Sequence, residues 1–496
     1  MSLGELLHAR ADQAPQSTAL FCGDRTMSYA ELDASSDGLA AWLLREGFEP
    51  GDRVAIQWPN AIEAVQLYFA AFKAGLIAVP INLRLKPAEI VWVVENSGAS
   101  LCFCHAALAD GMRQTGVRVL TELPAFAAAT AALPPPDDEA PALILYTSGS
   151  TGRPKGAVHS QRSLLVTGEL CTQDFEDTFR DVVKPRGLLM TPLMHASGLY
   201  VLLSSARLGE PCVLLPMFDP AAALDAIERF RCTLTLALPA MMQFILEEQV
   251  RKPRDLSSLK VIFAGGDSVP VALQERVRAV MGVGMVEGLA QTETGPSIVN
   301  PVRAPKLGSL GVADRGVDLR IVDGAGIDVP DGVPGELLVR SPAVCSGYWQ
   351  NPEATADALR DGWFYTGDLV SRDADGYYWF RGRLKEIIIR GGSNISPQEV
   401  EEALYTHPEI LEAGVVGLPH DVWGEMVVAV IALRDGATSG ADDIREHARQ
   451  TLADYKVPEQ VHFLPVLPKG ATGKVHRKAL KDMLTDAVPH SPGSQS

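Results

Sequence analysis

The sequence predicts an α/β protein with a large N-terminal domain of layered βα subdomains, which includes a small β-subdomain, and then a small, mobile α+β C-terminal domain. Its length of 496 residues exceeds what one hydrophobic core normally serves, so two or more domains are expected. Short apolar runs alternate with longer runs of helical pattern, and this βαβα order favours parallel strands covered by helices. From residue 317 onward the runs shorten and Gly or Pro turns recur, which is typical of a β-subdomain.

The individual elements follow from apolar periodicity and from the residues that begin them. Ser28 and Glu31 have capping-box spacing, which marks the beginning of a helix. In the first 105 residues we predict helices at 3–10, 28–46, 61–74 and 87–95, and strands at 54–58, 77–80 and 100–104. Further along we predict helices at 163–171, 220–230, 241–248 and 271–281, and strands at 142–146, 187–190, 212–215, 234–238 and 261–264.

Changes in composition indicate the domain boundaries. An Ala-rich and then Pro-rich surface linker is expected at 121–141. We predict the large domain at 1–384, with its β-subdomain near 317–382, and the small domain at 385–486 after a hinge at Lys385. Its predicted elements lie at 386–389, 397–405, 412–418, 427–432, 442–452 and 460–463, and the polar tail at 487–496 is expected to be disordered.

Composition excludes several classes of protein. Hydrophobic residues make up 47% and charged residues 21%, as in an ordinary globular protein. The net charge of −17 argues against a nucleic acid or an anionic membrane as the main partner. No run of 18 apolar residues and no leader pattern is present, so we predict no membrane span and a cytoplasmic location. The seven scattered cysteines form no disulfide or zinc pattern, and Cys102 and Cys104 are expected in the core.

The stretch from Tyr146 to Gly156 is the strongest functional signal. It follows a predicted buried strand, and its glycines allow backbone N–H groups to face a ligand closely. Hydroxyls and the charge of Lys155 suit phosphate oxygens, although Gly156 after the lysine breaks the Walker pattern. A flexible surface loop is the plainer alternative. The predicted phosphate-binding residues are Thr147, Ser148, Gly149, Ser150, Thr151, Gly152 and Lys155.

At this loop, and at further motifs in the same order, the sequence resembles the adenylate-forming ligase superfamily. That superfamily holds acyl-CoA synthetases, beetle luciferases and the adenylation domains of peptide synthetases, and this sequence is most like an acyl-CoA synthetase. The resemblance covers nearly the whole chain, as far as Lys474. It implies ATP, Mg²⁺ and coenzyme A as cofactors.

Two further motifs lie in the predicted large domain. Gly265, Gly266 and Asp267 follow a strand, where ligands gather in α/β sheets; alone they would indicate a tight turn, and the resemblance implies an adenine cradle. The Thr292-Glu293 pair matches a superfamily motif, in which Thr292 would bond the α-phosphate.

Glu293 is the predicted Mg²⁺ ligand, because Mg²⁺ prefers oxygen ligands and bridges phosphate to carboxylate. Leu289 and Ala290 stand where most members have an aromatic residue and Gly. We therefore expect apolar contact from Leu289 in place of adenine stacking, with Ala290 and Gln291 also in the nucleotide site.

Two matches concern the ribose and the adenylation step. Asp368, in Tyr-Thr-Gly-Asp, would accept from both ribose hydroxyls, and Arg383 would make a second ribose or phosphate contact. Lys474 ends the heptapeptide that begins at Pro468 and matches the superfamily's invariant lysine. A mobile cation there would stabilise the transition state as a carboxylate attacks the α-phosphate, so Lys474 and the phosphate loop should act on one nucleotide.

Two more matches concern the second half-reaction and the acid. Gly391 and Gly392 would let the pantetheine arm of CoA pass against bare backbone, after a domain rotation about Lys385. His195 resembles a substrate-side residue that shapes the acyl pocket or gates pantetheine entry. A carboxylate needs no general base, so we assign it no proton transfer. The predicted pocket residues are His195, Ala196, Ser197, Pro239, Met241, Met242, Phe244 and Leu289.

These matches together predict an ATP-dependent acyl-CoA ligase that activates a fatty or aryl monocarboxylic acid through an acyl-AMP intermediate. No acidic anchor for an α-amino group stands beside His195, which disfavours amino acids. Two alternatives stay open: an adenylation enzyme that loads the phosphopantetheine thiol of a carrier protein, and a non-catalytic metabolite-binding module. A homodimer is also left open by the sequence.

Overall fold

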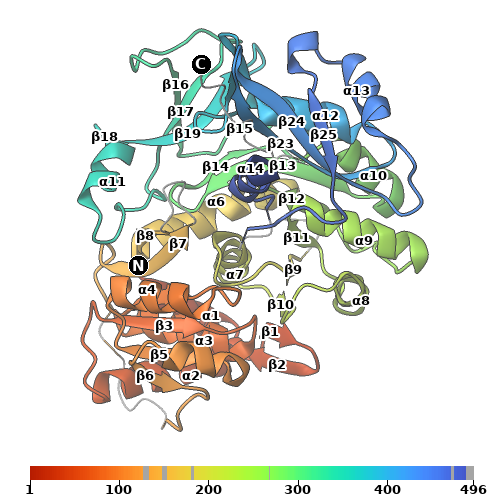
Figure 1. Ribbon diagram of the computed structural model, residues 1–496. Coiled ribbons are helices and arrows are strands. Elements are labelled where there is room, and N and C mark those ends of the chain that lie inside the picture. The colour runs from red at the N-terminus through yellow and green to blue at the C-terminus, as the bar shows by residue number, and fades with distance from the viewer. Residues whose placement is uncertain are drawn as a thin grey trace. The chain divides into compact units, whose positions relative to one another are not determined.

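The computed structural model describes residues 1–126, 133, 135–147, 154–179, 184–266, 269–470 and 474–487. The chain divides into two compact units, and Figure 1 labels their helices and strands. The first unit comprises residues 1–269, 274–320 and 338–365, and the second comprises 270–273, 321–337 and 366–496. Lys385 lies in a turn within the second unit, and its role as a hinge stays a prediction.

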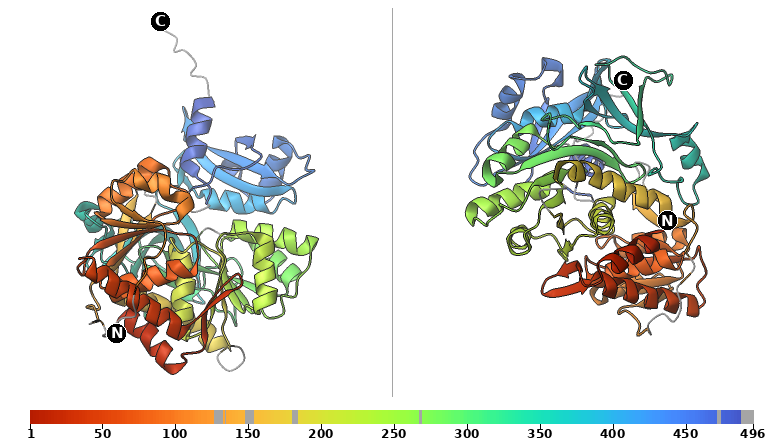
Figure 2. Two further views of the ribbon diagram at one scale, coloured as in Figure 1. Left: turned by 90° about the horizontal axis from the view of Figure 1, so that it is seen from below. Right: turned by 180° about the vertical axis from the view of Figure 1, so that it is seen from behind.

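A six-stranded sheet in the first unit has the order β6-β5-β3-β4-β7-β8. Its strands pair in parallel except for β7 with β8. Successive residues of β3 and β5 enter two separate apolar clusters, so helices cover both faces (Figure 2). The elements here are α1 Leu3–Gln13, α2 Tyr29–Arg45, β3 Arg53–Gln57, α3 Ile62–Lys73, β4 Ile77–Pro80, α4 Pro87–Ser97, β5 Leu101–Cys104, η1 Ala106–Leu108, α5 Ala109–Arg113, β6 Arg118–Leu120, β7 Pro141–Thr147 and β8 Lys155–Ser160.

A nine-stranded sheet in the first unit has the order β15-β14-β13-β12-β11-β9-β10-β1-β2. The six strands from β13 to β1 in that order are parallel, and antiparallel pairs close both edges. Its elements are β1 Thr18–Cys22, β2 Arg25–Ser28, α6 Gln161–Phe179, β9 Gly187–Leu189, α7 Ala196–Leu208, β10 Cys212–Leu214, α8 Pro220–Phe230, β11 Leu234–Ala237, α9 Pro239–Arg251, β12 Val261–Ala264, α10 Val271–Met281, β13 Gly284–Gln291, β14 Gly295–Val299 and β15 Val312–Ala313.

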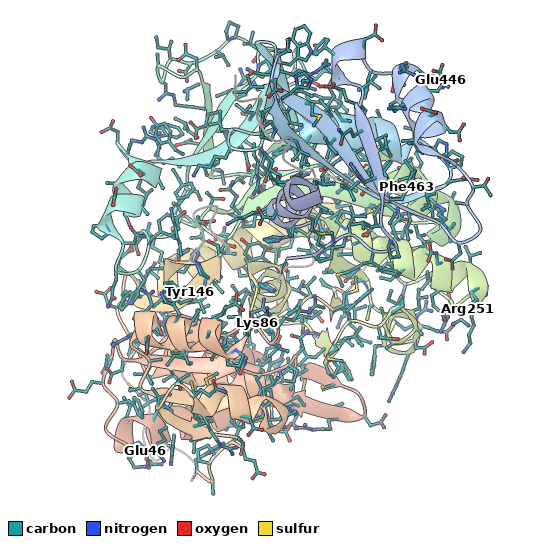
Figure 3. All side chains as sticks on the ribbon, viewed as in Figure 1. Glu46, Lys86, Tyr146, Arg251, Glu446 and Phe463 are labelled. Carbon is teal, nitrogen blue, oxygen red and sulfur yellow. The ribbon has the colours of Figure 1, made fainter. Side chains whose placement is uncertain are left out.

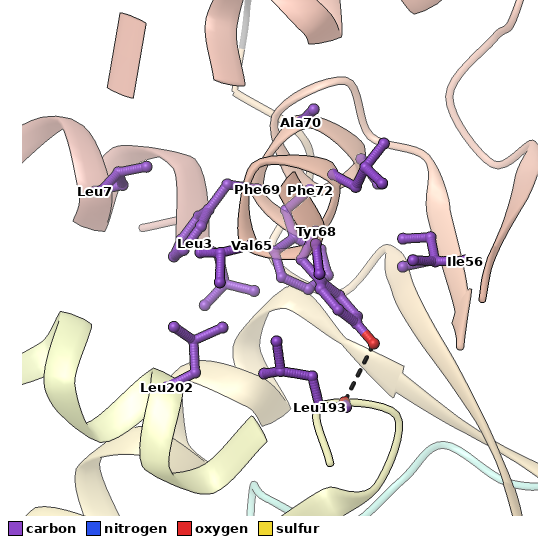
Figure 4. Packing of buried hydrophobic residues seen from close by; sticks show 14 of the residues in the cluster. Leu3, Leu7, Ile56, Val65, Tyr68, Phe69, Ala70, Phe72, Leu193 and Leu202 are labelled. Carbon is purple, nitrogen blue, oxygen red and sulfur yellow. Dashed lines mark hydrogen bonds between the residues drawn. The ribbon is translucent and has the colours of Figure 1, made fainter. Parts of the chain in front are cut away.

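Helix α3 forms the centre of the main core of the first unit. Almost every side chain of this helix is buried, which is the pattern of a helix packed on all sides. Figure 4 shows Tyr68 and Phe72 of α3 among side chains from neighbouring elements, and the Tyr68 hydroxyl donates to the Leu193 carbonyl at 3.2 Å. At the end of α3, the buried Lys73 ammonium lies 2.6 Å from a carboxylate oxygen of Asp33, which satisfies its charge.

The remaining strands form two smaller sheets. One has the order β16-β17-β19-β18, with β20 paired to β19, and the other has the order β22-β21-β24-β23, with β25 paired to β24. In the latter, Val415 and Val416 enter different apolar clusters, because neighbouring strand residues face opposite sides. The elements are β16 Asp318–Val322, β17 Gly335–Arg340, α11 Pro352–Ala358, β18 Leu359–Arg360, β19 Trp363–Arg372, β20 Tyr378–Arg383, β21 Ile388–Arg390, β22 Ser393–Ile395, α12 Pro397–Tyr405, β23 Ile410–His420, β24 Gly424–Leu433, α13 Ala441–Arg449, η2 Asp454–Lys456, β25 Gln460–Phe463 and α14 Arg477–Ala487.

Most predicted elements are present, and the α/β class is confirmed. The capping box is confirmed, since Ser28 and Glu31 bond each other's backbone N–H groups. Cys102 and Cys104 are buried as expected. The expectation of parallel pairing was incomplete, because hairpins close the sheet edges. No described helix is long and apolar enough to cross a membrane. Of the tail predicted to be disordered, Ala487 ends α14 and the other residues lie outside the described ones.

Candidate active site

The predicted phosphate loop connects the two strands of a hairpin. Thr147 at the end of β7 pairs with Lys155 at the beginning of β8, and the Thr147 hydroxyl donates to the Lys155 carbonyl at 3.4 Å. The sequence predicted a helix after the loop, but it did not predict strand β8, which lies between the loop and that helix. Ser148, Gly149, Ser150, Thr151 and Gly152 lie outside the described residues, so the structure gives only the two ends of the loop.

Both sides of this hairpin are anchored by side chains. The hydroxyl of Tyr146, which Figure 3 labels, donates to Asn96 at 2.6 Å, and burial raises the pKa of this tyrosine above its usual range. The Lys155 ammonium lies 5.1 Å from the centre of the Tyr348 ring, within the range of a cation–π contact. No ion pair joins Lys155 to a carboxylate within the described part of the chain. A positive charge at this end of the loop suits phosphate oxygens.

Three consecutive carbonyls of the predicted Thr-Glu motif are each bonded by a different part of the first unit. The Tyr200 hydroxyl on α7 donates to the Gln291 carbonyl at 3.0 Å. The His159 Nε2 atom on β8 lies 2.7 Å from the Thr292 carbonyl, and the Cys345 N–H donates to the Glu293 carbonyl at 2.7 Å. These bonds fix the backbone from which the Thr292 and Glu293 side chains extend.

Two hydroxyl groups of the first unit lie close to the carboxylate of Glu293. The Tyr348 hydroxyl donates to its Oε1 atom at 3.0 Å, and the Thr147 hydroxyl lies 3.5 Å from the same oxygen. The structure therefore brings together three of the predicted residues, Thr147, Lys155 and Glu293, through a fourth that the sequence did not suggest, Tyr348.

This donor set suits a magnesium ion that arrives with a nucleotide. No group of three or more His, Cys, Asp or Glu side chains that could hold a metal occurs among the described residues. Mg²⁺ usually binds one or two carboxylates together with substrate phosphates and waters, so one carboxylate at the phosphate loop is sufficient. Glu293, held by Tyr348, fits that requirement.

His159 supports the Thr-Glu motif through its contact with the Thr292 carbonyl. The sequence did not predict this role. The His159 imidazole is buried, and desolvation lowers its pKa from 6.5 to about 4. A carbonyl only accepts hydrogen bonds, so Nε2 carries the proton toward Thr292, while Nδ1 faces the Ser163 hydroxyl at 3.3 Å. His159 is therefore neutral near pH 7. A single histidine three residues after Gly156 gave no sequence signal of this contact.

We expect the buried His159 to make the first unit less stable in acid. The unfolded chain binds a proton below about pH 6.5, whereas the folded chain resists it until about pH 4, so stability falls as pH drops through this window. The loss should be on the order of 3 kcal/mol. Urea unfolding at pH 7 and pH 4.5 should show a smaller loss for His159→Gln, whose amide can still donate to Thr292, than for wild type. An equal loss in both proteins would contradict the assignment; His462→Gln, on the surface of β25, is the control.

The predicted adenine region lies at the carboxyl end of β12. Gly266 has φ +85°, which favours glycine, and a Cβ on Gly265 would lie 3.4 Å from the Gly288 carbonyl. Asp267 lies outside the described residues. Leu289 is half-buried and Ala290 is exposed, and both lie in β13, a strand the sequence did not predict. Their nucleotide contacts stay predictions.

His195 occupies the N-cap of α7. The Asn82 amide lies 3.2 Å from His195 Nε2; since an amide nitrogen only donates, Nε2 acts as acceptor there. This agrees with a shaping role and no proton donation from that atom. Among the predicted pocket residues on α9, Met242 is buried, whereas Phe244 is 48% exposed.

The predicted ribose residues are brought together in the second unit. Asp368 on β19 and Arg383 on β20 are directly opposite in the antiparallel register, and Arg383 Nε lies 3.1 Å from Asp368 Oδ1. The Asp368 N–H donates to the Thr366 hydroxyl at 3.1 Å, which fixes the backbone of β19 just before Asp368. A carboxylate with a paired guanidinium suits a vicinal diol, and the ribose contact stays a prediction.

Gly391 and Gly392 form the two-residue turn between β21 and β22. Their φ angles of +57° and +84° match a type I′ hairpin, which requires positive φ at both positions. A Cβ on Gly391 would lie 3.0 Å from the Trp423 ring, whereas a Cβ on Gly392 would have no neighbour within 4 Å. Lys474 lies in another turn, where its carbonyl accepts from the Gly470 N–H at 2.8 Å; residues 471–473 lie outside the described ones.

Comparison with known proteins decides the family. Residues 7–349 match the AMP-binding enzyme model, and residues 399–474 match the model of the AMP-binding enzyme C-terminal domain. The chain belongs to the AMP-binding enzyme family. The predicted superfamily, the fold of a large and a small domain, and the class of AMP-forming acid–CoA ligase are confirmed by these matches and the relatives below.

This AMP-binding enzyme has similar relatives along almost its whole length. It is 38% identical to a feruloyl-CoA synthase from Amycolatopsis sp, covering 95% of this chain and 97% of the relative. It is 36% identical to an indoleacetate–CoA ligase from Aromatoleum aromaticum, covering 98% of each. The crystal structure of the anthranilate CoA ligase AuaEII with anthranoyl-AMP is similar, with a TM-score of 0.91, 27% identity and 98% of each chain covered. ATP and CoA use is therefore confirmed for this class, and Mg²⁺ stays a prediction.

Proposed function

We propose that this ligase activates a monocarboxylic acid, with aryl acids favoured over fatty acids, and transfers the acyl group to CoA. The arrangement around Glu293 carries the proposal, because the Glu293 carboxylate lies beside Thr147 at one end of the phosphate loop and Tyr348 contacts both this carboxylate and Lys155 at the other end. The relatives named above are ligases of feruloyl, indoleacetate and anthranilate groups, and this supports an aryl acid. Met241 and Met242, which the sequence predicts in the acyl pocket, are apolar and buried, and this agrees with such a substrate.

Each residue then has a role in the first half-reaction. Lys155 and the loop would bind the β- and γ-phosphates, and Thr292 would bond the α-phosphate. Glu293 would hold Mg²⁺, which neutralises phosphate charge when bound. The substrate carboxylate oxygen attacks the α-phosphorus in line and pyrophosphate leaves with the bonding electrons, giving acyl-AMP; Lys474 stabilises the charge that develops.

The second half-reaction uses the same acyl-AMP. The CoA thiolate attacks the acyl carbon, the carbon–oxygen bond to AMP breaks, and AMP leaves with the electrons. Gly391 and Gly392 would give the pantetheine arm a path along bare backbone, because they carry no side chains there. The carrier-protein alternative, the hinge at Lys385, the cytoplasmic location and the homodimer stay predictions.

A pyrophosphate-release screen tests this function. The purified chain is incubated with ATP, Mg²⁺ and panels of aryl, fatty and amino acids, with and without CoA. We expect release with aryl acids above the other panels, and acyl-CoA formation only when CoA is added. Adenylation without acyl-CoA would favour a carrier-protein acceptor, and no release with any acid would favour the non-catalytic module.

A further inference from the structure

Tyr348 lies in a segment that extends the hairpin of the phosphate loop. Residues 346–349 run antiparallel to β8: the Val158 N–H donates to the Gly347 carbonyl at 2.9 Å, and the Trp349 N–H donates to the Gly156 carbonyl at 2.7 Å. The Tyr348 N–H donates to the Thr355 hydroxyl at 2.9 Å. Its backbone is therefore fixed on both sides, beside the strand that begins with Lys155.

The side chain of Tyr348 contacts two charged groups through different surfaces. Its hydroxyl donates to Glu293 at 3.0 Å, and its ring faces the Lys155 ammonium at 5.1 Å. Burial and the nearby Glu293 charge raise the pKa of the phenol, so it stays a hydrogen-bond donor at neutral pH. Tyr348 thus contacts the Glu293 carboxylate through its hydroxyl and the Lys155 ammonium through the face of its ring.

We propose that Tyr348 is a positioning residue that keeps Glu293 and Lys155 apart and oriented for magnesium-bound ATP. Without it, the carboxylate of Glu293, in the turn between β13 and β14, and the ammonium of Lys155, at the beginning of β8, could form a direct ion pair that occupies both groups. The hydroxyl fixes the rotation of the Glu293 carboxylate, and the ring supports the Lys155 ammonium without neutralising it. This inference rests on the proposed function, because it assigns Glu293 to Mg²⁺ and Lys155 to phosphate.

Two substitutions separate the hydroxyl from the ring. Tyr348→Phe removes the bond to Glu293 and keeps the ring, so the Mg²⁺ concentration for half-maximal ATP binding should rise by about 10-fold, the usual effect of losing a partner of a metal ligand. ATP binding in EDTA should stay within about twofold of wild type. Tyr348→Leu removes the ring as well as the hydroxyl. In addition to the higher Mg²⁺ requirement, its affinity for ATP in EDTA should therefore be about fivefold weaker than that of wild type.

Isothermal titration calorimetry with ATP, in Mg²⁺ or EDTA, provides these values independently of turnover. Tyr29→Phe is the control, since it removes the hydroxyl bonds of a buried tyrosine in the same unit, to the Glu210 and Ser205 carbonyls. It should not change the Mg²⁺ dependence. Reaction of preformed acyl-AMP with CoA should stay near the wild-type rate in Tyr348→Phe, because that step needs neither Mg²⁺ nor the β- and γ-phosphates.

An unchanged Mg²⁺ requirement in Tyr348→Phe, or the same change in Tyr29→Phe, would overturn the inference. So would equal weakening with Mg²⁺ and with EDTA, which would indicate general loss of structure. The proposed function is tested separately: wild type that binds magnesium-bound ATP but releases no pyrophosphate with any acid would reject the reaction and leave the calorimetric test of Tyr348 intact.

Discussion

Replacing Lys474 with alanine is expected to lower the rate of acyl-AMP formation by on the order of 10²-fold or more, the usual effect of removing one electrostatic group from a transition state. Two anions meet when the carboxylate attacks the α-phosphate, and charge moves onto pyrophosphate, so a missing cation raises the barrier directly. Alanine keeps the Lys474 carbonyl, which accepts from the Gly470 N–H, so this bond of the local turn remains. Pyrophosphate release measures this half-reaction.

The second half-reaction provides the internal comparison for Lys474→Ala. Preformed acyl-AMP should react with CoA at nearly the wild-type rate, since no pyrophosphate leaves in that step. Lys478→Ala removes an exposed lysine four positions further along and should change neither rate. Equal losses in both half-reactions of Lys474→Ala would refute the assigned role.

Gly392→Trp should have the opposite selectivity, with thioester formation lowered by on the order of 10²-fold, as for misplaced reacting groups, and adenylation spared. Gly392 lies in the β21–β22 turn with φ +84°, and a Cβ added there would have nothing within 4 Å. A Cβ at this position therefore clashes with no described atom, and we expect a bulky side chain here to act on a group that passes along this backbone. Gly391 is less suitable, because a Cβ there lies 3.0 Å from Trp423.

Backbone strain must be separated from this blockage. Gly436 provides the match, since it has φ +81°, has nothing within 4 Å of an added Cβ and is exposed in the loop after β24. Gly436→Trp should carry a similar strain of about 1–2 kcal/mol. Single-turnover rates of acyl-AMP formation and of its reaction with CoA compare the two variants. Normal thioester turnover in Gly392→Trp, or a matching defect in Gly436→Trp, would remove the argument for a pantetheine path.

The sequence predicted best those helices and strands whose first and last residues are of types that begin or end such elements. Helix α8 was predicted at its observed bounds because Pro220 begins it, next to the capping Asp219. Strand β8 was missed because Lys155–Ser160 has no long apolar run, and its pairing with β7 depends on the loop between them. The other hairpins at the sheet edges also depend on pairing across a connecting segment, which apolar runs do not indicate. The sequence therefore favoured purely parallel sheets.

The candidate site likewise contains residues that the sequence predicted and residues that only the structure shows. Lys155 was a candidate because glycines and hydroxyls surround it in the sequence, and Glu293 because its motif resembles one of the superfamily; the roles of both stay predictions. Their supports were not predictable, because His159 and Tyr348 reach the motif through contacts between residues 133 and 55 positions apart. A lone histidine or tyrosine has no pattern along the chain, and only the folded backbone shows what it bonds.

The three bonded carbonyls of residues 291–293 have a practical consequence for dissecting the protein. Their donors come from Tyr200, His159 and the N–H of Cys345, so the last of these is supplied long after the motif itself has been synthesised. A fragment that ends shortly after residue 295 would contain the predicted ATP-site motifs of the first unit but lack the Cys345 N–H that bonds the Glu293 carbonyl. The smallest fragment worth expressing for nucleotide binding must extend beyond Tyr348, and the AMP-binding match ends one residue later, at 349.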